Sequence, residues 1–93
     1  MKLKPGLYCI ATPIGNLKDI TLRAIETLQH CDIIACEDTR VSSKLLSHYG
    51  IDKKLWVYHD HNAEKVRPLI LKAIQEGQAV GLISLLSQVI YPK

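Results

Sequence analysis

Strand-like and helix-like segments alternate along the whole 93-residue chain. Short apolar runs predict buried strands, and stretches whose apolar residues recur every three or four positions predict amphipathic helices between them. The predicted strands cover 7–11, 33–36, 55–58 and 79–83, and the predicted helices cover 21–30, 40–49 and 63–76. A β-α-β-α-β-α-β order is typical of a parallel sheet with right-handed crossovers. We therefore expect an α/β, doubly wound fold with about four strands and three helices.

The second strand and the helix after it carry the clearest packing signals. Ile33-Ile34-Ala35-Cys36 is apolar without interruption, as expected when both faces of a sheet are covered. In the following helix, Val41, Leu45 and Tyr49 recur every four residues and predict its buried stripe. The expected helix caps are Asp19 or Thr21 for the first helix, Thr39 for the second and Asn62 for the third, and the expected C-terminal glycines are Gly50 and Gly77.

Composition bounds the class of protein. An apolar fraction of 47% and a charged fraction of 23% are ordinary for one small globular domain. The net charge of +3 permits contact with nucleic acid without arguing for it. The three cysteines form no Cys-x-x-Cys pair, which favours a reducing, cytoplasmic setting. No apolar stretch approaches the length of a membrane span, so we expect no membrane partner.

The turn after the first strand, Thr12-Pro13-Ile14-Gly15-Asn16, leads from a strand to a helix N-terminus. Such a turn can bind an anion or a cofactor, because backbone N–H groups and the helix dipole meet there. It is neither a G-x-G-x-x-G fingerprint nor a Walker A loop. Two interpretations are open: a cofactor pocket with a directional hydrogen bond from Asn16, or a tight turn that needs proline and glycine for its geometry.

Polar residues also follow the second strand, in Glu37-Asp38-Thr39-Arg40. Two adjacent carboxylates and an arginine at a strand end could orient a ligand hydroxyl or hold a cationic group. Alternatively, the acids are placed favourably at a helix N-terminus and serve only as a cap. At most two of these four side chains are expected to face one site.

A third polar group, His59-Asp60-His61-Asn62, follows the third strand. Two histidines at period two can bind a metal ion, but one strand offers only two ligands. A polar turn or a substrate contact is the alternative, and we assign no metal ligand. Trp56 and Tyr58 alternate with aliphatic residues and are expected to be packing residues.

Taken in order, these segments resemble the N-terminal domain of the tetrapyrrole methylase superfamily. More narrowly, they are similar to bacterial small-subunit ribosomal RNA 2′-O-ribose (cytidine) methyltransferases. The resemblance runs from about Gly6 to Ser84. Its motifs are Ala-Thr-Pro-Ile-Gly-Asn-Leu at 11–17, Asp-Ile-Thr-Leu-Arg-Ala at 19–24, Cys-Glu-Asp-Thr-Arg at 36–40, Leu-Leu-x-His-Tyr-Gly-Ile at 45–51 and His-x-His-Asn at 59–62.

The resemblance implies transfer of a methyl group from S-adenosylmethionine to a ribose 2′-hydroxyl of small-subunit ribosomal RNA, in a cleft between two α/β domains. Proteins of this kind are commonly homodimers. The positions implied to lie beside the cofactor are Thr12, Pro13, Ile14, Gly15 and Asn16. The positions implied to line the substrate side are Glu37, Asp38, Arg40, His59, His61 and Asn62. Positioning roles are expected for Asn16, Asp38, Arg40 and His61, and no catalytic base is assigned.

The chain departs from the family pattern after Ser84. There the family has an acidic loop that contains glycine and proline, whereas this chain continues Leu85-Leu86-Ser87-Gln88. We therefore expect an incomplete N-terminal domain over 1–84, a divergent tail over 85–93 and no C-terminal domain. Such a truncated fragment is expected to be inactive alone. The alternatives are a non-catalytic remnant and, less favoured, a metal-dependent hydrolase that uses His59 and His61.

Overall fold

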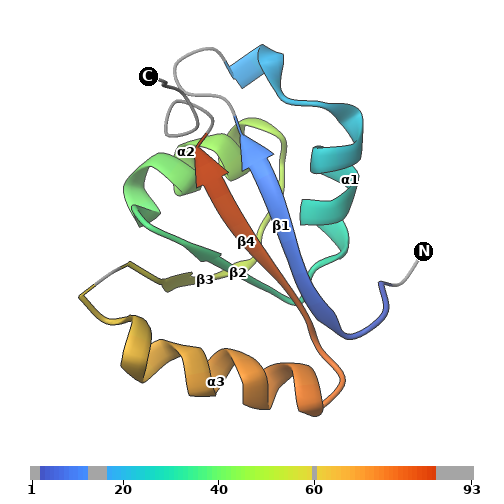
Figure 1. The fold of residues 1–93 in the computed structure, drawn as a ribbon. Helices are drawn as coiled ribbons and strands as arrows, with labels where there is room; N and C mark the ends of the chain where they lie inside the picture. The colour runs from blue at the N-terminus through green and yellow to red at the C-terminus, as the bar shows by residue number, and fades with distance from the viewer. Residues whose placement is uncertain (1–2, 13–16, 60, 86–93) are drawn as a thin grey trace, which may run out of the picture.

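A computed structural model describes residues 3–12, 17–59 and 61–85 of the chain. Its strands and helices follow the predicted order, with one short 3₁₀ turn added before the first helix (Figure 1). The strands are β1 (Gly6–Thr12), β2 (Ile33–Cys36), β3 (Lys54–Val57) and β4 (Ala79–Leu85), and the helices are α1 (Leu22–His30), α2 (Thr39–His48) and α3 (Ala63–Gln75). All strand pairs are parallel, in the order β1-β4-β2-β3. The predicted α/β class is confirmed.

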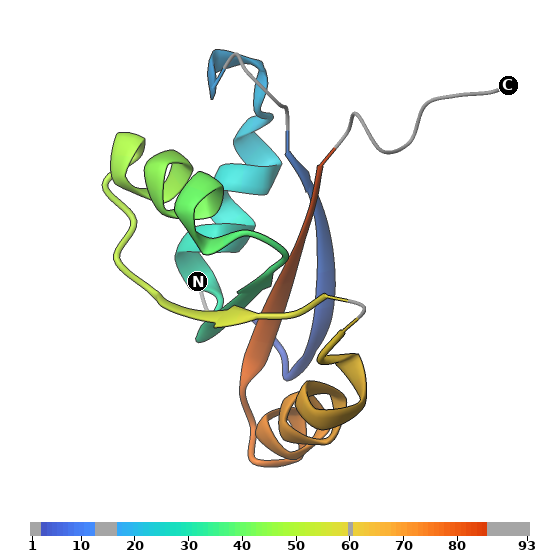
Figure 2. The same cartoon turned by 90° about the vertical axis from the view of Figure 1, so that its left-hand side faces the viewer.

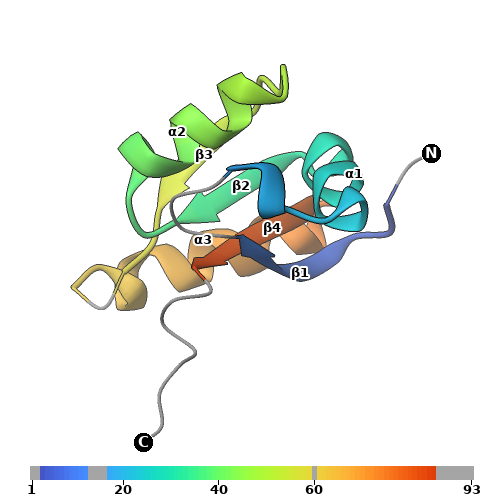
Figure 3. The same cartoon turned by 90° about the horizontal axis from the view of Figure 1, so that it is seen from above.

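Helices cover both faces of the sheet. Figure 2 shows α1 and α2 on one face and α3 on the other, and Figure 3 shows from above that α1 and α2 lie along the same side. In β2, Ile34 and Cys36 join the core under α1 and α2, whereas Ile33 and Ala35 join the core under α3. This alternation explains why the whole strand is apolar. Trp56 and Tyr58 pack against the α3 core, as predicted for packing residues.

The residues observed at the N-terminal ends of the helices differ from the predicted caps in two cases. Thr21 caps α1 as predicted, since its Oγ1 accepts a hydrogen bond from the Ala24 N–H at 3.1 Å. The cap of α2 is Asp38 rather than Thr39, and the helix begins one residue earlier than predicted. Asn62 occupies the N-cap position of α3, but its side chain makes no capping hydrogen bond. Among the described residues, no helix combines the length and the apolar character needed to cross a membrane.

The buried face of α2 also differs from the prediction. Leu45 and Leu46 are buried with Ser42, whereas Val41 is 47% exposed. A stripe through positions 42, 45 and 46 follows the i, i+3, i+4 spacing of one helix face, and Val41 lies on its flank. The predicted stripe placed Val41 in the core because it counted only the aliphatic and aromatic residues and passed over the small Ser42.

The three thiols differ in environment. Cys9 is exposed on β1, whereas Cys31 and Cys36 are buried among apolar side chains. Burial raises the pKa of the Cys31 thiol from 9.0 to about 11, with a further contribution from the nearby Asp32 carboxylate. Burial also raises the pKa of Cys36. Because the thiolate is the reactive form, only Cys9 is expected to react readily.

Thiol labelling with a chromogenic disulfide at pH 8 checks this expectation. One equivalent should react quickly, and Cys31 should lag by about 100-fold or more, because two pKa units remove about 99% of its thiolate. Unfolding the chain in guanidinium chloride should release all three thiols at similar rates. Three equal rates in the folded protein would contradict the buried placement.

Candidate functional site

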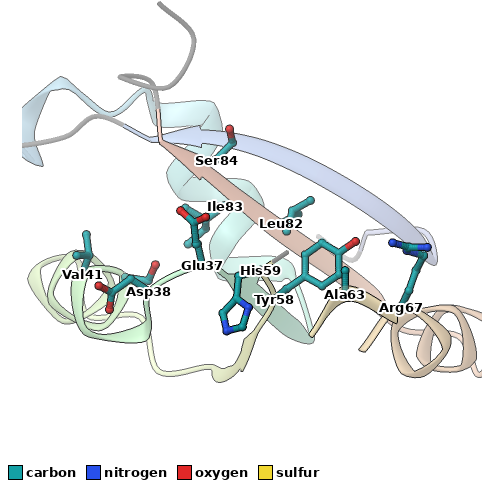
Figure 4. A pocket seen from close by; sticks show the side chains of 11 residues that line it. Glu37, Asp38, Val41, Tyr58, His59, Ala63, Arg67, Leu82, Ile83 and Ser84 are labelled. Carbon is teal, nitrogen blue, oxygen red and sulfur yellow. The ribbon is translucent and has the colours of Figure 1, made fainter. Parts of the chain in front are cut away.

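A pocket of about 280 Å³ lies at the carboxyl edge of the sheet (Figure 4). It lies beyond the end of β2, between β4 on one side and the chain that follows β3 on the other. There the chain leaves β2 for α2 on one face of the sheet and leaves β3 for α3 on the other. Crevices of this kind, at the carboxyl ends of parallel strands, are the usual ligand sites of open α/β sheets. We call it the strand-end pocket; it is lined by Glu37, Asp38, Val41, Ser42, Tyr58, His59, Ala63, Arg67, Leu82, Ile83 and Ser84.

The β2 side of the pocket carries two carboxylates, Glu37 and Asp38. Asp38 Oδ1 accepts the Arg40 backbone N–H at 2.9 Å, and the Arg40 guanidinium donates to both carboxylate oxygens at 3.3 Å. These hydrogen bonds from Arg40 hold the pKa of Asp38 below its usual value. Arg40 itself is 89% exposed and does not line the pocket. Glu37 lines the pocket beside Asp38.

The β3 side is organised by Asn62. Its Oδ1 accepts the His59 N–H at 2.8 Å, and its Nδ2 donates to the Val57 carbonyl at 3.0 Å. The side chain thus fixes the turn between β3 and α3 instead of capping the helix. The His61 N–H donates to His59 Nδ1 at 3.2 Å. A neutral His59 ring that accepts at Nδ1 carries its proton on Nε2, so it offers a hydrogen-bond donor there.

Two lining residues escaped the sequence interpretation. Tyr58 was assigned to packing, and Arg67 received no role, yet both line the pocket. The Arg67 guanidinium lies beside the Tyr58 hydroxyl, and its interaction with that hydroxyl raises the pKa of Arg67. Arg67 lies four residues after Ala63, so both fall on the face of α3 that meets the pocket near the N-terminal end of the helix.

The structure thus brings together three of the six residues predicted on the substrate side. Glu37, Asp38 and His59 line one pocket, whereas Arg40, His61 and Asn62 do not line it. The role of each residue toward substrate stays a prediction.

Thr12, the last residue of β1, is a buried polar residue at the same edge of the sheet. It is 1% exposed, and among the described side chains its Oγ1 is buried without a hydrogen-bond partner. Buried hydroxyls are normally paired, so this one calls for an explanation. The other predicted cofactor residues, Pro13, Ile14, Gly15 and Asn16, lie outside the described residues.

The described part of the chain shows no group of three or more His, Cys, Asp or Glu side chains placed to share a metal ion. The His59 and His61 rings lie edge to face, with centroids 5.7 Å apart. Nδ1 of His59 is engaged by the His61 backbone. Nothing in this geometry favours the metal-dependent alternative.

Comparison with known proteins links the fold to a family. Residues 6–85 match the family model of the tetrapyrrole (corrin/porphyrin) methylases. A relative from Mesorhizobium japonicum named ribosomal RNA small subunit methyltransferase I is 60% identical over 82 residues, which is 88% of this chain and 28% of the relative. Proteins of the same name from Erythrobacter litoralis (65% over 72 residues; 77% of the chain, 26% of the relative) and Rickettsia prowazekii (56% over 84 residues; 90% and 30%) are also similar.

The match covers all four strands and all three helices. It also covers both polar segments that build the strand-end pocket. The chain belongs to the tetrapyrrole (corrin/porphyrin) methylase family.

Proposed function

We propose that this chain forms the cofactor- and RNA-facing part of a methyltransferase that modifies a ribose 2′-hydroxyl of small-subunit ribosomal RNA. The observation that carries the proposal is the position of the strand-end pocket. Glu37, Asp38 and His59, from two of the segments that carry the resemblance to this class of enzyme, are among the residues that line it. The names of the similar proteins support an rRNA substrate. The proposal includes the cytoplasmic location that the cysteine pattern favours and the homodimer that the resemblance implies.

S-adenosylmethionine is the cofactor in this proposal. The fit rests on Thr12, whose buried, unpartnered hydroxyl lies at the carboxyl end of β1 and could bond to a polar group of a ligand. Thr12 and the four residues after it would hold the cofactor. When bound, S-adenosylmethionine supplies an electrophilic methyl group, so the protein's main task is to position the acceptor.

The lining residues can divide that task. Glu37 is our choice to accept a hydrogen bond from the ribose hydroxyl, since carboxylates accept from hydroxyl groups and can take up a proton. Asp38 lines the same side of the pocket, where Arg40 engages both of its oxygens and lowers its pKa. His59 offers a donor at Nε2 rather than an acceptor, which suits a contact with an oxygen of the substrate.

The chain spans only about a quarter to a third of the relatives' length, with 28%, 26% and 30% of the three proteins above covered. A test of the whole activity therefore needs the rest of such an enzyme. We suggest a chimaera in which residues 6–85 of this chain replace the matching segment of the Mesorhizobium protein.

The chimaera is expected to methylate small-subunit rRNA, and nucleoside mass spectrometry should find the methyl group on a ribose. Glu37→Gln in the chimaera should lower kcat by roughly 100-fold, in the range for loss of a general base. Glu76→Gln, at the far end of α3, is the matched control and should leave kcat unchanged. A folded chimaera that methylates a base, or that transfers no methyl group, would contradict the proposal.

A further inference from the structure

The strand-end pocket is polarised in charge. Glu37 and Asp38 line the side that follows β2, whereas Tyr58, His59 and Arg67 line the side that follows β3 (Figure 4). The second group consists of hydrogen-bond donors on two adjoining elements. A pocket with acceptors at one end and donors at the other suits a ligand that carries a hydroxyl and an anion close together.

Two of these donors, Tyr58 and Arg67, lie beside each other, whereas Figure 4 shows the His59 ring pointing away from them. The Tyr58 hydroxyl lies beside the Arg67 guanidinium, and its phenolic proton can be donated to an acceptor in the pocket. The Tyr58 ring packs against the core under α3, so the hydroxyl is anchored from the sheet side. His59 presents its Nε2 proton because its Nδ1 accepts from the His61 backbone.

The volume of the strand-end pocket limits the size of the ligand that it can hold. A volume of about 280 Å³ falls just below the range of roughly 300–1,000 Å³ that is usual for sites of drug-sized molecules. It suits a fragment such as one sugar and its phosphate. Arginine is the preferred side chain for phosphate, because its planar fork matches two phosphate oxygens.

We propose that Arg67 and Tyr58 form a phosphate subsite that holds the RNA phosphodiester next to the ribose to be methylated. This proposal rests on the proposed function and adds to it the group that positions the RNA backbone. The subsite places the phosphate at the β3 side and turns the sugar hydroxyl toward Glu37. Its ligand is the phosphodiester rather than the carboxylate of the cofactor.

Binding of the 93-residue chain to a labelled six-nucleotide single-stranded RNA tests the subsite. Arg67→Ala should weaken binding roughly tenfold at low salt. It should also reduce the slope of log K against log salt concentration by about 0.7, the value for loss of one phosphate contact to a single strand. Arg67→Lys keeps the charge and should retain the slope while it weakens binding about threefold, because the fork is lost.

Two further variants separate the subsite from general charge effects. Tyr58→Phe keeps the packed ring and should weaken RNA binding about threefold with the same melting temperature. Arg23→Ala removes the same charge from an exposed position on α1, which lies on the opposite face of the sheet from α3. It should change RNA affinity by less than twofold. None of the four variants should alter the affinity for S-adenosylmethionine.

Failure of the subsite and failure of the proposed function give different results. Equal effects of Arg67→Ala and Arg23→Ala, or an unchanged salt slope for Arg67→Ala, would overturn the subsite and leave the methyltransferase proposal standing. If Arg67→Ala weakened the binding of S-adenosylmethionine but not that of RNA, Arg67 would be a contact of the cofactor carboxylate. That result would overturn the subsite. A wild-type chain that does not bind the RNA, together with an inactive but folded chimaera, would overturn both.

Discussion

Replacing Gly81 by alanine is expected to destabilise the chain by about 1–3 kcal/mol, the usual effect of an added methyl group in a packed core. Gly81 lies on β4, between β1 and β2. A Cβ at this position would meet Cys31 Sγ at 2.8 Å and Ile10 Cδ1 at 3.0 Å. Both neighbours are buried, so neither can move away without disturbing the core. Thermal or urea unfolding measures the loss, and a domain of this size should lose about 4–8 °C in melting temperature per kcal/mol.

A double-mutant cycle with Cys31→Ala shows whether the contact is the cause. Cys31→Ala removes the sulfur that the new methyl group would strike, so the double variant should be more stable than the sum of the two single effects by about 1 kcal/mol or more. Gly81→Ala with unchanged or increased stability would contradict the close approach. Strictly additive effects would mean that Cys31 is not the group that resists the methyl.

The order of the elements could be predicted because each buried strand is marked by its apolar residues. β2 agrees with the prediction residue for residue, since both of its faces are covered and every side chain is apolar. β1 and β4 are each two residues longer than predicted. They pair over seven residues, from Gly6 with Ala79 to Thr12 with Leu85, and backbone hydrogen bonding extends the strands beyond their apolar parts.

The sequence predicted less well which residues cap the helices and which side chains of α2 are buried. Asp38 and Thr39 are both good cap residues, so propensity could not rank them. The choice is made by the backbone after β2, which presents the Arg40 N–H to Asp38. Asn62 was predicted to cap α3. Its side chain instead hydrogen-bonds to the backbone of Val57 and His59 and so fixes the turn after β3.

The candidate site was predictable where polar residues follow strands, as for Glu37, Asp38 and His59. Arg67 was missed because it lies inside a helix, and only the path of α3 brings it to the pocket. Tyr58 was missed as a site residue because it does two things: its ring packs in the core while its hydroxyl contacts Arg67. A pattern of alternating apolar residues reveals the first role and conceals the second.

The second large effect is expected at Thr12, where stability and binding should change in opposite directions. Thr12→Val replaces a buried, unpartnered hydroxyl by a methyl group of similar shape. Since a buried polar group without a partner destabilises a fold by about 1–3 kcal/mol, the variant should be more stable by an amount of that order. Thermal unfolding of the 93-residue chain measures this gain.

The same substitution should weaken S-adenosylmethionine binding, because the proposed function gives this hydroxyl its missing partner in the bound cofactor. The chimaera described above provides the measurement: Thr12→Val should raise the Kd for S-adenosylmethionine about tenfold, in line with loss of one buried hydrogen bond. Thr12→Ser keeps the hydroxyl and should bind nearly as well as the wild type. A Thr12→Val chain that is less stable than the wild type would show that the hydroxyl has a partner within the fold. A more stable variant with unchanged cofactor affinity would remove Thr12 from the cofactor site, because the buried hydroxyl would then bind no ligand.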